Sequence, residues 1–185
     1  HIKKWGSITP MMVIIHHHRG EFEKSLDYAW ELKKIGVESG DRQLQGWGYG
    51  MSGFLKIRMG NFEEAVKDLD QSKFLLESIP DYFALIFTHV DLMSCYLHME
   101  NYTNAHAAIK AAENMVIGKH LKGFVESRFY NAHCEFYLTL FEKSIQIGEK
   151  ITLRKIKKHA ARAICQGRRF KCGLSEACRL NGWFY

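Results

Sequence analysis

The chain is poor in the residues and patterns that interrupt helices or build strands. Only two of its 185 residues are proline, and the apolar–polar alternation of a half-buried strand is hard to find. Apolar residues recur instead at spacings of three and four along most of the length, as in helices with one buried face. Because 46% of the residues are apolar, a sizeable core is available. The sequence predicts an all-α protein.

Long hydrophobic runs are also lacking. No stretch approaches the roughly 18 consecutive apolar residues that cross a bilayer, and no basic leader followed by an apolar segment is found. The chain opens on His1 and closes on the apolar residues 182–185 (GWFY), so we expect a segment of a larger polypeptide. The five cysteines are an odd number and contain no CxxC pair. We therefore expect reduced thiols and a cytoplasmic location.

Acidic residues are nearly missing from the C-terminal part. Between Lys150 and Arg179, ten Lys or Arg residues accompany one acid, Glu176, whereas the whole chain has a formal net charge of +6. A predicted helix within 150–171 carries these cations at helical spacing: Lys150, Arg154, Lys157, Lys158 and Arg162. Such a face could bind phosphates or another anionic surface, or could simply be solvated. Aromatic residues are not interleaved with the charges, which disfavours single-stranded nucleic acid.

A short sequence pattern, the forty-residue echo, is repeated at intervals of forty residues. Its copies are residues 20–25 (GEFEKS), 60–65 (GNFEEA) and 100–105 (ENYTNA). In each copy an aromatic residue is followed three positions later by serine or alanine, which is small enough to let helices approach closely. A constant interval of this length indicates one structural unit that is repeated and stacked.

Capping and turn residues predict where the helices begin and end. Thr9 followed by Pro10 predicts the start of the first helix, and Asp41, Asn61 and Asn101 are expected to cap the helices that follow them. The predicted helices cover residues 11–18, 22–39, 42–59, 62–78, 82–99, 102–117, 121–141, 151–165 and 174 onward. The short breaks between them favour antiparallel pairs.

Residues 60–65, with Gly53 seven positions earlier, resemble the best-preserved element of the tetratricopeptide repeat, Gly-x-Tyr/Phe-x-x-Ala. The resemblance covers residues 9–117, although the period is near 40 rather than about 34, and the family's first-helix Trp and end-of-repeat Pro are mostly absent. It implies a right-handed superhelical solenoid of antiparallel helix pairs. We expect one domain over 1–185, with units at 9–39, 41–78, 81–118 and 121–169 and a further unit starting at 173–185.

The resemblance also implies a function in protein–protein interaction. A peptide, or another domain of the parent chain, would bind in a concave groove, and no catalytic step or cofactor is expected. The groove positions carried over from the family are His17, Trp47, Phe54, Ile57, Arg58, Phe87, Leu97 and His98. Trp47, Phe54 and Arg58 should contribute most, since aromatic and Arg side chains dominate binding energies. The Lys and Asn clamp that some members use for chaperone tails is absent, which disfavours that ligand.

The longer helices are similar to the repeat arrays of large signalling ATPases and adenylyl-cyclase-like proteins. An alternative function is therefore that of a sensor arm in a larger nucleotide-dependent enzyme, and another is anion binding by the basic helix. Repeat arrays without polar terminal caps leave apolar faces open. Self-association through the ends is therefore a further possibility.

Residues 48–53 spell GxGxxG, but the dinucleotide fingerprint needs a strand before it. Residues 41–47 are neither apolar nor β-branched enough to form one. We therefore place these glycines inside a helix, where each costs about 0.8–1 kcal/mol relative to alanine, and attribute them to close helix packing.

Three other arrangements contain residue types that can bind metals or act as thiol nucleophiles. Residues 16–18 are all histidine, but consecutive helical residues point about 100° apart and cannot converge on one ion. His159 with Cys165, Cys172 and Cys178 lacks the short spacing of a zinc knuckle. Residues 133–135 (HCE) and the cysteine at position 95 do not lie at a predicted turn that would expose the thiol as a nucleophile. Polar helix ends and structural cysteines are the favoured interpretations.

Overall fold

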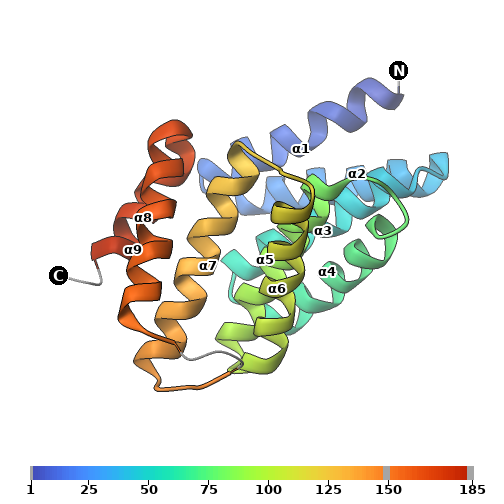
Figure 1. Cartoon of the computed structure of the whole chain (residues 1–185). Helices are drawn as coiled ribbons and strands as arrows, with labels where there is room; N and C mark the ends of the chain where they lie inside the picture. The colour runs from blue at the N-terminus through green and yellow to red at the C-terminus, as the bar shows by residue number, and fades with distance from the viewer. Residues whose placement is uncertain (1, 148–150, 183–185) are drawn as a thin grey trace. The chain divides into compact units, whose positions relative to one another are not determined.

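A computed structural model describes residues 2–147 and 151–182, with side-chain environments from residue 8 onward except at Cys172. The described residues contain helices and no strand (Figure 1), which confirms the all-α prediction. None of these helices is both long and apolar enough to span a bilayer. In chain order they are α1 (Ile2–His18), α2 (Phe22–Ser39), α3 (Arg42–Arg58), α4 (Phe62–Leu76), α5 (Tyr82–His98), α6 (Tyr102–Gly118), α7 (Phe124–Glu142), α8 (Leu153–Arg169), the short 3-10 helix η1 (Lys171–Gly173) and α9 (Leu174–Gly182).

Two compact units make up the chain, His1–Cys95 and Tyr96–Tyr185, and the division falls inside α5. Consecutive helices pack together within each unit, as in a helical repeat. The finer division into four repeat units stays a prediction.

The forty-residue echo is a repeated backbone turn. Its first residue has a left-handed φ in all three copies, 75° at Gly20, 79° at Gly60 and 57° at Glu100. In each turn the next residue donates its N–H to the carbonyl five positions back, at 2.9, 2.9 and 2.8 Å. This hydrogen bond closes the preceding helix. Glycine adopts the left-handed region without strain, which explains its presence in two of the three copies.

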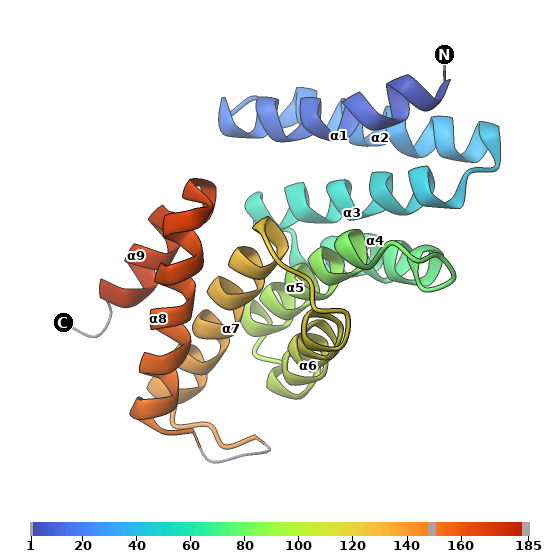
Figure 2. The ribbon, with the colours of Figure 1, turned by 45° about the horizontal axis from the view of Figure 1, so that its top comes forward.

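The first unit places α3 between α2 and α4, as Figure 2 shows. Val13 of α1, Ala29 of α2 and Leu55 of α3 form a buried core cluster, against which Phe22 and Phe54 pack. Three helices thus contribute to one core. The helix pair α3–α4 therefore packs on the pair α1–α2 through the contact between α2 and α3.

Glycines let α3 approach both neighbours closely. A Cβ atom at Gly48 would lie 2.6 Å from the backbone nitrogen of Lys33 in α2. One at Gly53 would lie 2.6 Å from Cγ of Leu69 in α4. Both distances are far below a normal carbon contact, so α3 could not pack this closely with alanine at these positions. Residues 48–53 therefore belong to a packed helix, and the dinucleotide-binding interpretation is wrong.

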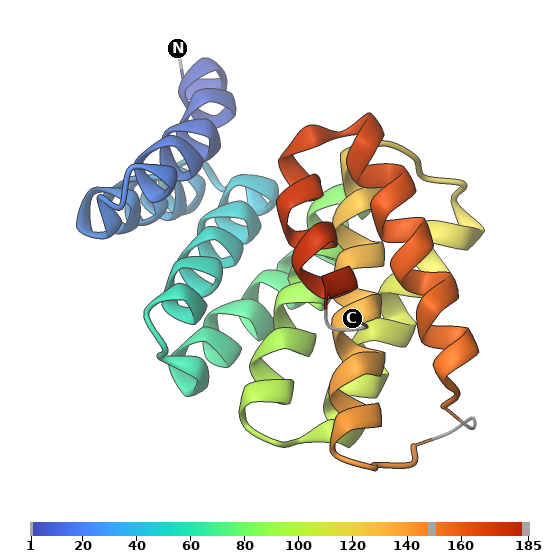
Figure 3. The same cartoon turned by 90° about the vertical axis from the view of Figure 1, so that its left-hand side faces the viewer.

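The second unit is built on α7. Helices α8 and α9 both contact α7 and each other, as Figure 3 shows, and α6 also packs on α7. Phe129, Phe136 and Tyr137 of α7 are among the largest fully buried side chains of the chain. Helix α7 is therefore the core helix of this unit.

Three predicted helix starts differ from the structure: α7 begins at Phe124 instead of residue 121, α8 begins at Leu153 instead of residue 151, and α1 begins before residue 11. Helix α1 begins at Ile2 and has Pro10 in its interior, so Thr9 does not cap it. Pro10 removes the hydrogen bond that an N–H there would give to the carbonyl of residue 6. Asn61 makes no capping hydrogen bond with its side chain. Asp41 and Asn101 do cap their helices, by accepting from backbone N–H groups of the first turn.

Candidate functional site

Three of the predicted groove residues form one contiguous surface in the first unit. The rings of His17 in α1 and Phe54 in α3 meet edge to face, with centroids 4.9 Å apart. The guanidinium carbon of Arg58 lies 5.3 Å from the Phe54 centroid, a favourable cation–π distance. Phe54 is half-buried and Arg58 is exposed. The result is an aromatic and cationic surface, the α3 surface, which also includes half-buried Ile57.

The repeated turn explains why these residues meet. His17 is in the last turn of α1, and Phe54 and Arg58 are one turn apart near the end of α3. His17 also contacts Phe22 at the start of α2, with ring centroids 5.6 Å apart. The tight connection from α1 to α2 therefore fixes the imidazole against Phe54.

The other predicted groove residues have different surroundings. Trp47 donates its indole N–H to Asp81 at 2.7 Å, so its polar atom is used inside the first unit. Phe87 contacts Phe83, with ring centroids 4.6 Å apart. In the second unit, His98 is exposed, but Leu97 is only 9% exposed and belongs to the core. The place of Leu97 and His98 in a groove stays a prediction.

The three consecutive histidines point in different directions. His16 is 2.6 Å from a carboxylate oxygen of Glu21 and stacks on Tyr28. His17 contacts Phe54, and His18 is exposed. Among the described residues, no cluster of His, Cys, Asp or Glu could hold a metal ion.

The basic patch lies on the outer face of α8. This helix contains seven Lys or Arg residues and no acid, and Ile156, Ala160 and Ala163 are buried on its inner side. The exposed cations are Arg154, Lys157, Lys158, Arg162, Arg168 and Arg169. None of them forms an ion pair with an acid in the described part of the chain. Lys150, also predicted for this patch, lies outside the described residues.

A buried histidine pair joins α7 to α8. The Nδ1 atoms of His133 and His159 are 2.9 Å apart, so one ring nitrogen donates to the other. Burial is the main cause that lowers the pKa of His133 to about 2 and the pKa of His159 to about 4. The nearby Lys155 and Arg162 act in the same direction. Both rings are therefore neutral at pH 7.

Aromatic and charged side chains surround this pair. Tyr137 stacks on His159 with centroids 5.3 Å apart, and the ammonium of Lys155 lies 4.7 Å from the Tyr137 ring. An oxygen of Glu113 in α6 is 3.7 Å from Nε2 of His133. The pairing was not predicted, because its two members are 26 residues apart and no motif relates them.

The neighbouring cysteine is not set up as a nucleophile. Cys134 is buried, and burial raises the pKa of its thiol to about 12. The thiol of Cys95 is buried as well, with its pKa raised to about 12 for the same reason. Because the thiolate is the reactive form, both are structural cysteines, as the sequence favoured.

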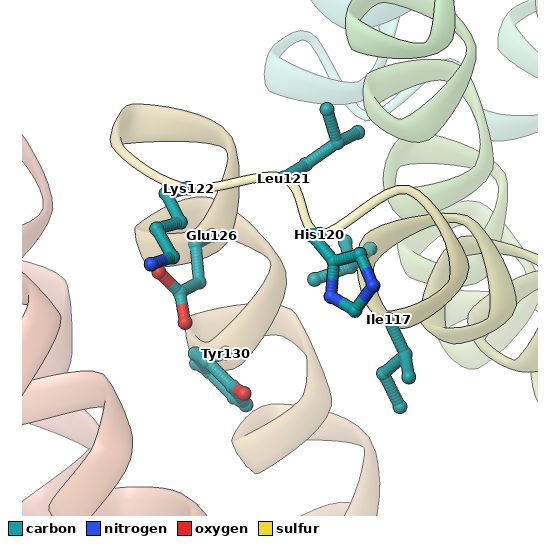
Figure 4. A pocket seen from close by; sticks show the side chains of 7 residues that line it. Ile117, His120, Leu121, Lys122, Glu126 and Tyr130 are labelled. Carbon is teal, nitrogen blue, oxygen red and sulfur yellow. The ribbon is translucent and has the colours of Figure 1, made fainter.

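A surface hollow of about 210 Å³ lies at the turn between α6 and α7. Figure 4 shows Ile117 and His120 on one side and Glu126 and Tyr130 on the other. The hollow is smaller than the roughly 300–1,000 Å³ of most small-molecule sites. Its polar groups come from one short turn and the start of α7, and they do not form a nucleophile–base arrangement.

Comparison with known proteins adds no assignment. No family model and no curated protein matches the chain.

Proposed function

We propose that this chain is a tetratricopeptide-like helical-repeat module that binds a protein segment on the α3 surface of His17, Phe54, Ile57 and Arg58. The single observation that carries the proposal is the contact of His17 in α1 with Phe54 in α3 and of Phe54 with Arg58, on α3, which also packs on α2 and α4. In this proposal the helix pairs continue as a right-handed solenoid, and the chain performs no catalytic step.

The arrangement of α3 supports the choice of this surface. Gly48 faces α2 and Gly53 faces α4, so two sides of α3 are used for packing. Phe54 and Arg58 are four residues apart and share a third side. Arg58 is exposed and forms no ion pair with an acid in the described ranges, so its charge is available to a partner.

The chemistry of the surface defines the partner. A half-buried phenyl ring offers apolar contact, and an exposed guanidinium beside it favours a carboxylate. The partner is therefore a protein segment with an acidic residue close to an apolar one. Binding energy should concentrate on Phe54 and Arg58, the residue types that dominate protein interfaces. The free thiols of Cys95, Cys134, Cys165 and Cys178 support an intracellular setting, and a role as sensor arm of a larger enzyme is compatible with it.

A random-peptide display library tests this proposal. Peptides selected on the wild-type chain should lose at least roughly tenfold in affinity, about 1.4 kcal/mol, on Phe54→Ala and on Arg58→Glu. Arg169→Glu on α8 is the matched charge-reversal control and should leave affinity unchanged. If the selected peptides bind all three variants as they bind the wild type, the α3 surface is not the binding site.

The outer face of α8 is a second candidate, for an anionic partner. Its support is the absence of ion pairs for six exposed cations within the described residues. The probe is a fluorescent double-stranded oligonucleotide, titrated at several salt concentrations. Displacement of counterions predicts a slope of log K against log salt of about −0.9 per phosphate contact, reduced by Arg154→Glu with Lys158→Glu. A salt-independent affinity, or one that the double variant leaves unchanged, would exclude this candidate.

A further inference from the structure

The outer face of α1 is apolar although it faces solvent. Ile8, Met11 and Ile15 are 52%, 60% and 48% exposed. Their spacing of three and four residues places them on one side of the helix. Val13, on the opposite side, is fully buried against α2 and α3. These three residues, the α1 face, are thus not needed for packing inside the first unit.

The forty-residue period relates the α1 face to a packed face of α3. One period after Ile8, Met11 and Ile15 come residues 48, 51 and 55. Gly48 lies against the backbone of Lys33 in α2. Leu55 is 0% exposed and shares the core cluster with Ala29 of α2. In α3, therefore, these positions pack on the helix that precedes it.

The corresponding positions of α5, two periods after those of α1, are also buried against the preceding helix. The positions are now Thr88, Asp91 and Cys95, which are 3%, 8% and 0% exposed. The hydroxyl oxygens of Thr88 and of Ser72 in α4 are 3.2 Å apart, so this side of α5 also meets the preceding helix. Packing in α3 and α5 thus continues from one helix pair to the next, and α1 has the same face uncovered.

We infer that the α1 face is a docking surface for an amphipathic helix that packs on it as α2 packs on α3. The inference goes beyond the proposed function, because it concerns a different surface and a helical partner. It rests on continuity with the α2–α3 and α4–α5 contacts, which use the same positions one and two periods later.

The two helices define the chemistry of the partner. Gly48 makes the α2–α3 approach possible, but α1 has Ile8 at that position, so the partner must supply the small residues. Helix α2 does this with Ala29 and Gly36, both buried. A second copy of α1 fits poorly, because it would oppose large residues to large residues.

The probe is a peptide of residues 21–40, the sequence of α2, which has the required small residues. A hydrocarbon staple between positions 30 and 34, both exposed in α2, keeps the isolated peptide helical. Fluorescence anisotropy with the whole chain should give saturable binding. Ile15→Glu in the chain should weaken it at least roughly tenfold. Ile117→Glu, at a residue of α6 that is 60% exposed, is the matched control and should leave it unchanged.

Three results would overturn the inference. The first is no saturable binding of the stapled peptide. The second is binding that Ile15→Glu leaves unchanged, which would mean that the peptide exchanges with the chain's own α2. The third is a dimer in sedimentation velocity without peptide that Ile15→Glu dissociates, which would make a second copy the occupant. A peptide variant with Ala29→Glu should lose affinity if the small residue lies in the contact.

Discussion

The indole Nε1 of Trp47 donates to the Oδ2 atom of Asp81 at 2.7 Å, which connects α3 to the start of α5. The same oxygen accepts from the side-chain amide of Gln43 at 2.8 Å. Oδ1 of Asp81 accepts from the backbone N–H of Ala84 at 3.1 Å and so caps α5. One carboxylate therefore serves as a helix cap and as the acceptor for two side chains. Trp47 has a structural role here, in addition to its predicted position in the groove.

Trp47→Phe is expected to lower the free energy of unfolding by about 1–2 kcal/mol, because it removes a hydrogen bond to a charged acceptor and keeps an aromatic ring. Urea unfolding followed by far-UV circular dichroism measures the change. Trp30→Phe is the control, since Trp30 is 61% exposed, and it should change stability by less than about 0.5 kcal/mol. Equal effects of the two substitutions would contradict the role of the hydrogen bond.

Most helix ends could be predicted from the sequence because they are set by local chemistry. The left-handed residues Gly20 and Gly60 end helices, and Asp41 and Asn101 cap them, as expected from residue type and position. The beginning of α1 could not be predicted, because Pro10 is a strong local signal for a helix start. Its helical surroundings are imposed by packing, which leaves Pro10 buried inside α1.

The candidate site was only partly predictable, for a related reason. Phe54 and Arg58 lie on one helix four residues apart, and the tetratricopeptide resemblance assigned both of them, with His17, to the groove. The contact between the rings of His17 and Phe54 was not predicted. The pairing of His133 with His159 depends on how α7 and α8 pack, and no local pattern encodes it.

Acidification should destabilise the fold through the buried histidine pair. Folding lowers the pKa of His159 to about 4 and that of His133 to about 2, so the unfolded chain binds more protons below its ordinary histidine pKa of about 6.5. Stability therefore falls as the pH drops through 6.5 and continues to fall toward 4 and below. Each ring should lower the free energy of unfolding by about 2 kcal/mol between pH 7 and pH 5, measured by urea unfolding at the two values.

The double variant His133→Phe with His159→Phe tests the source of this effect. It should lose most of the decrease between pH 7 and pH 5, apart from a contribution of His89, whose pKa burial lowers to about 4. His98→Phe, at an exposed position, should retain the full decrease. An unchanged pH dependence in the double variant would mean that the pair is not the titrating group.

The four cysteines with described side chains should differ in reactivity. Cys95 and Cys134 are buried with pKa values raised to about 12, whereas Cys165 and Cys178 are exposed. Brief treatment with N-ethylmaleimide at pH 7, followed by peptide mass spectrometry, should modify Cys165 and Cys178 and spare the other two. All four should react in denaturant. Modification of Cys95 or Cys134 at the rate of Cys165 in the folded chain would contradict their burial.

Gly48→Ala tests the central claim, that the repeat stacks helices closely enough to exclude a side chain, most directly. Alanine normally stabilises a helix by up to about 1 kcal/mol over glycine. At Gly48, however, the new Cβ would meet the backbone of Lys33. We predict that Gly48→Ala lowers the free energy of unfolding by about 1–3 kcal/mol. Gly118→Ala in α6, where a Cβ meets nothing within 4 Å, should be neutral or stabilising. A stabilising Gly48→Ala, equal to Gly118→Ala, would contradict the stacked arrangement.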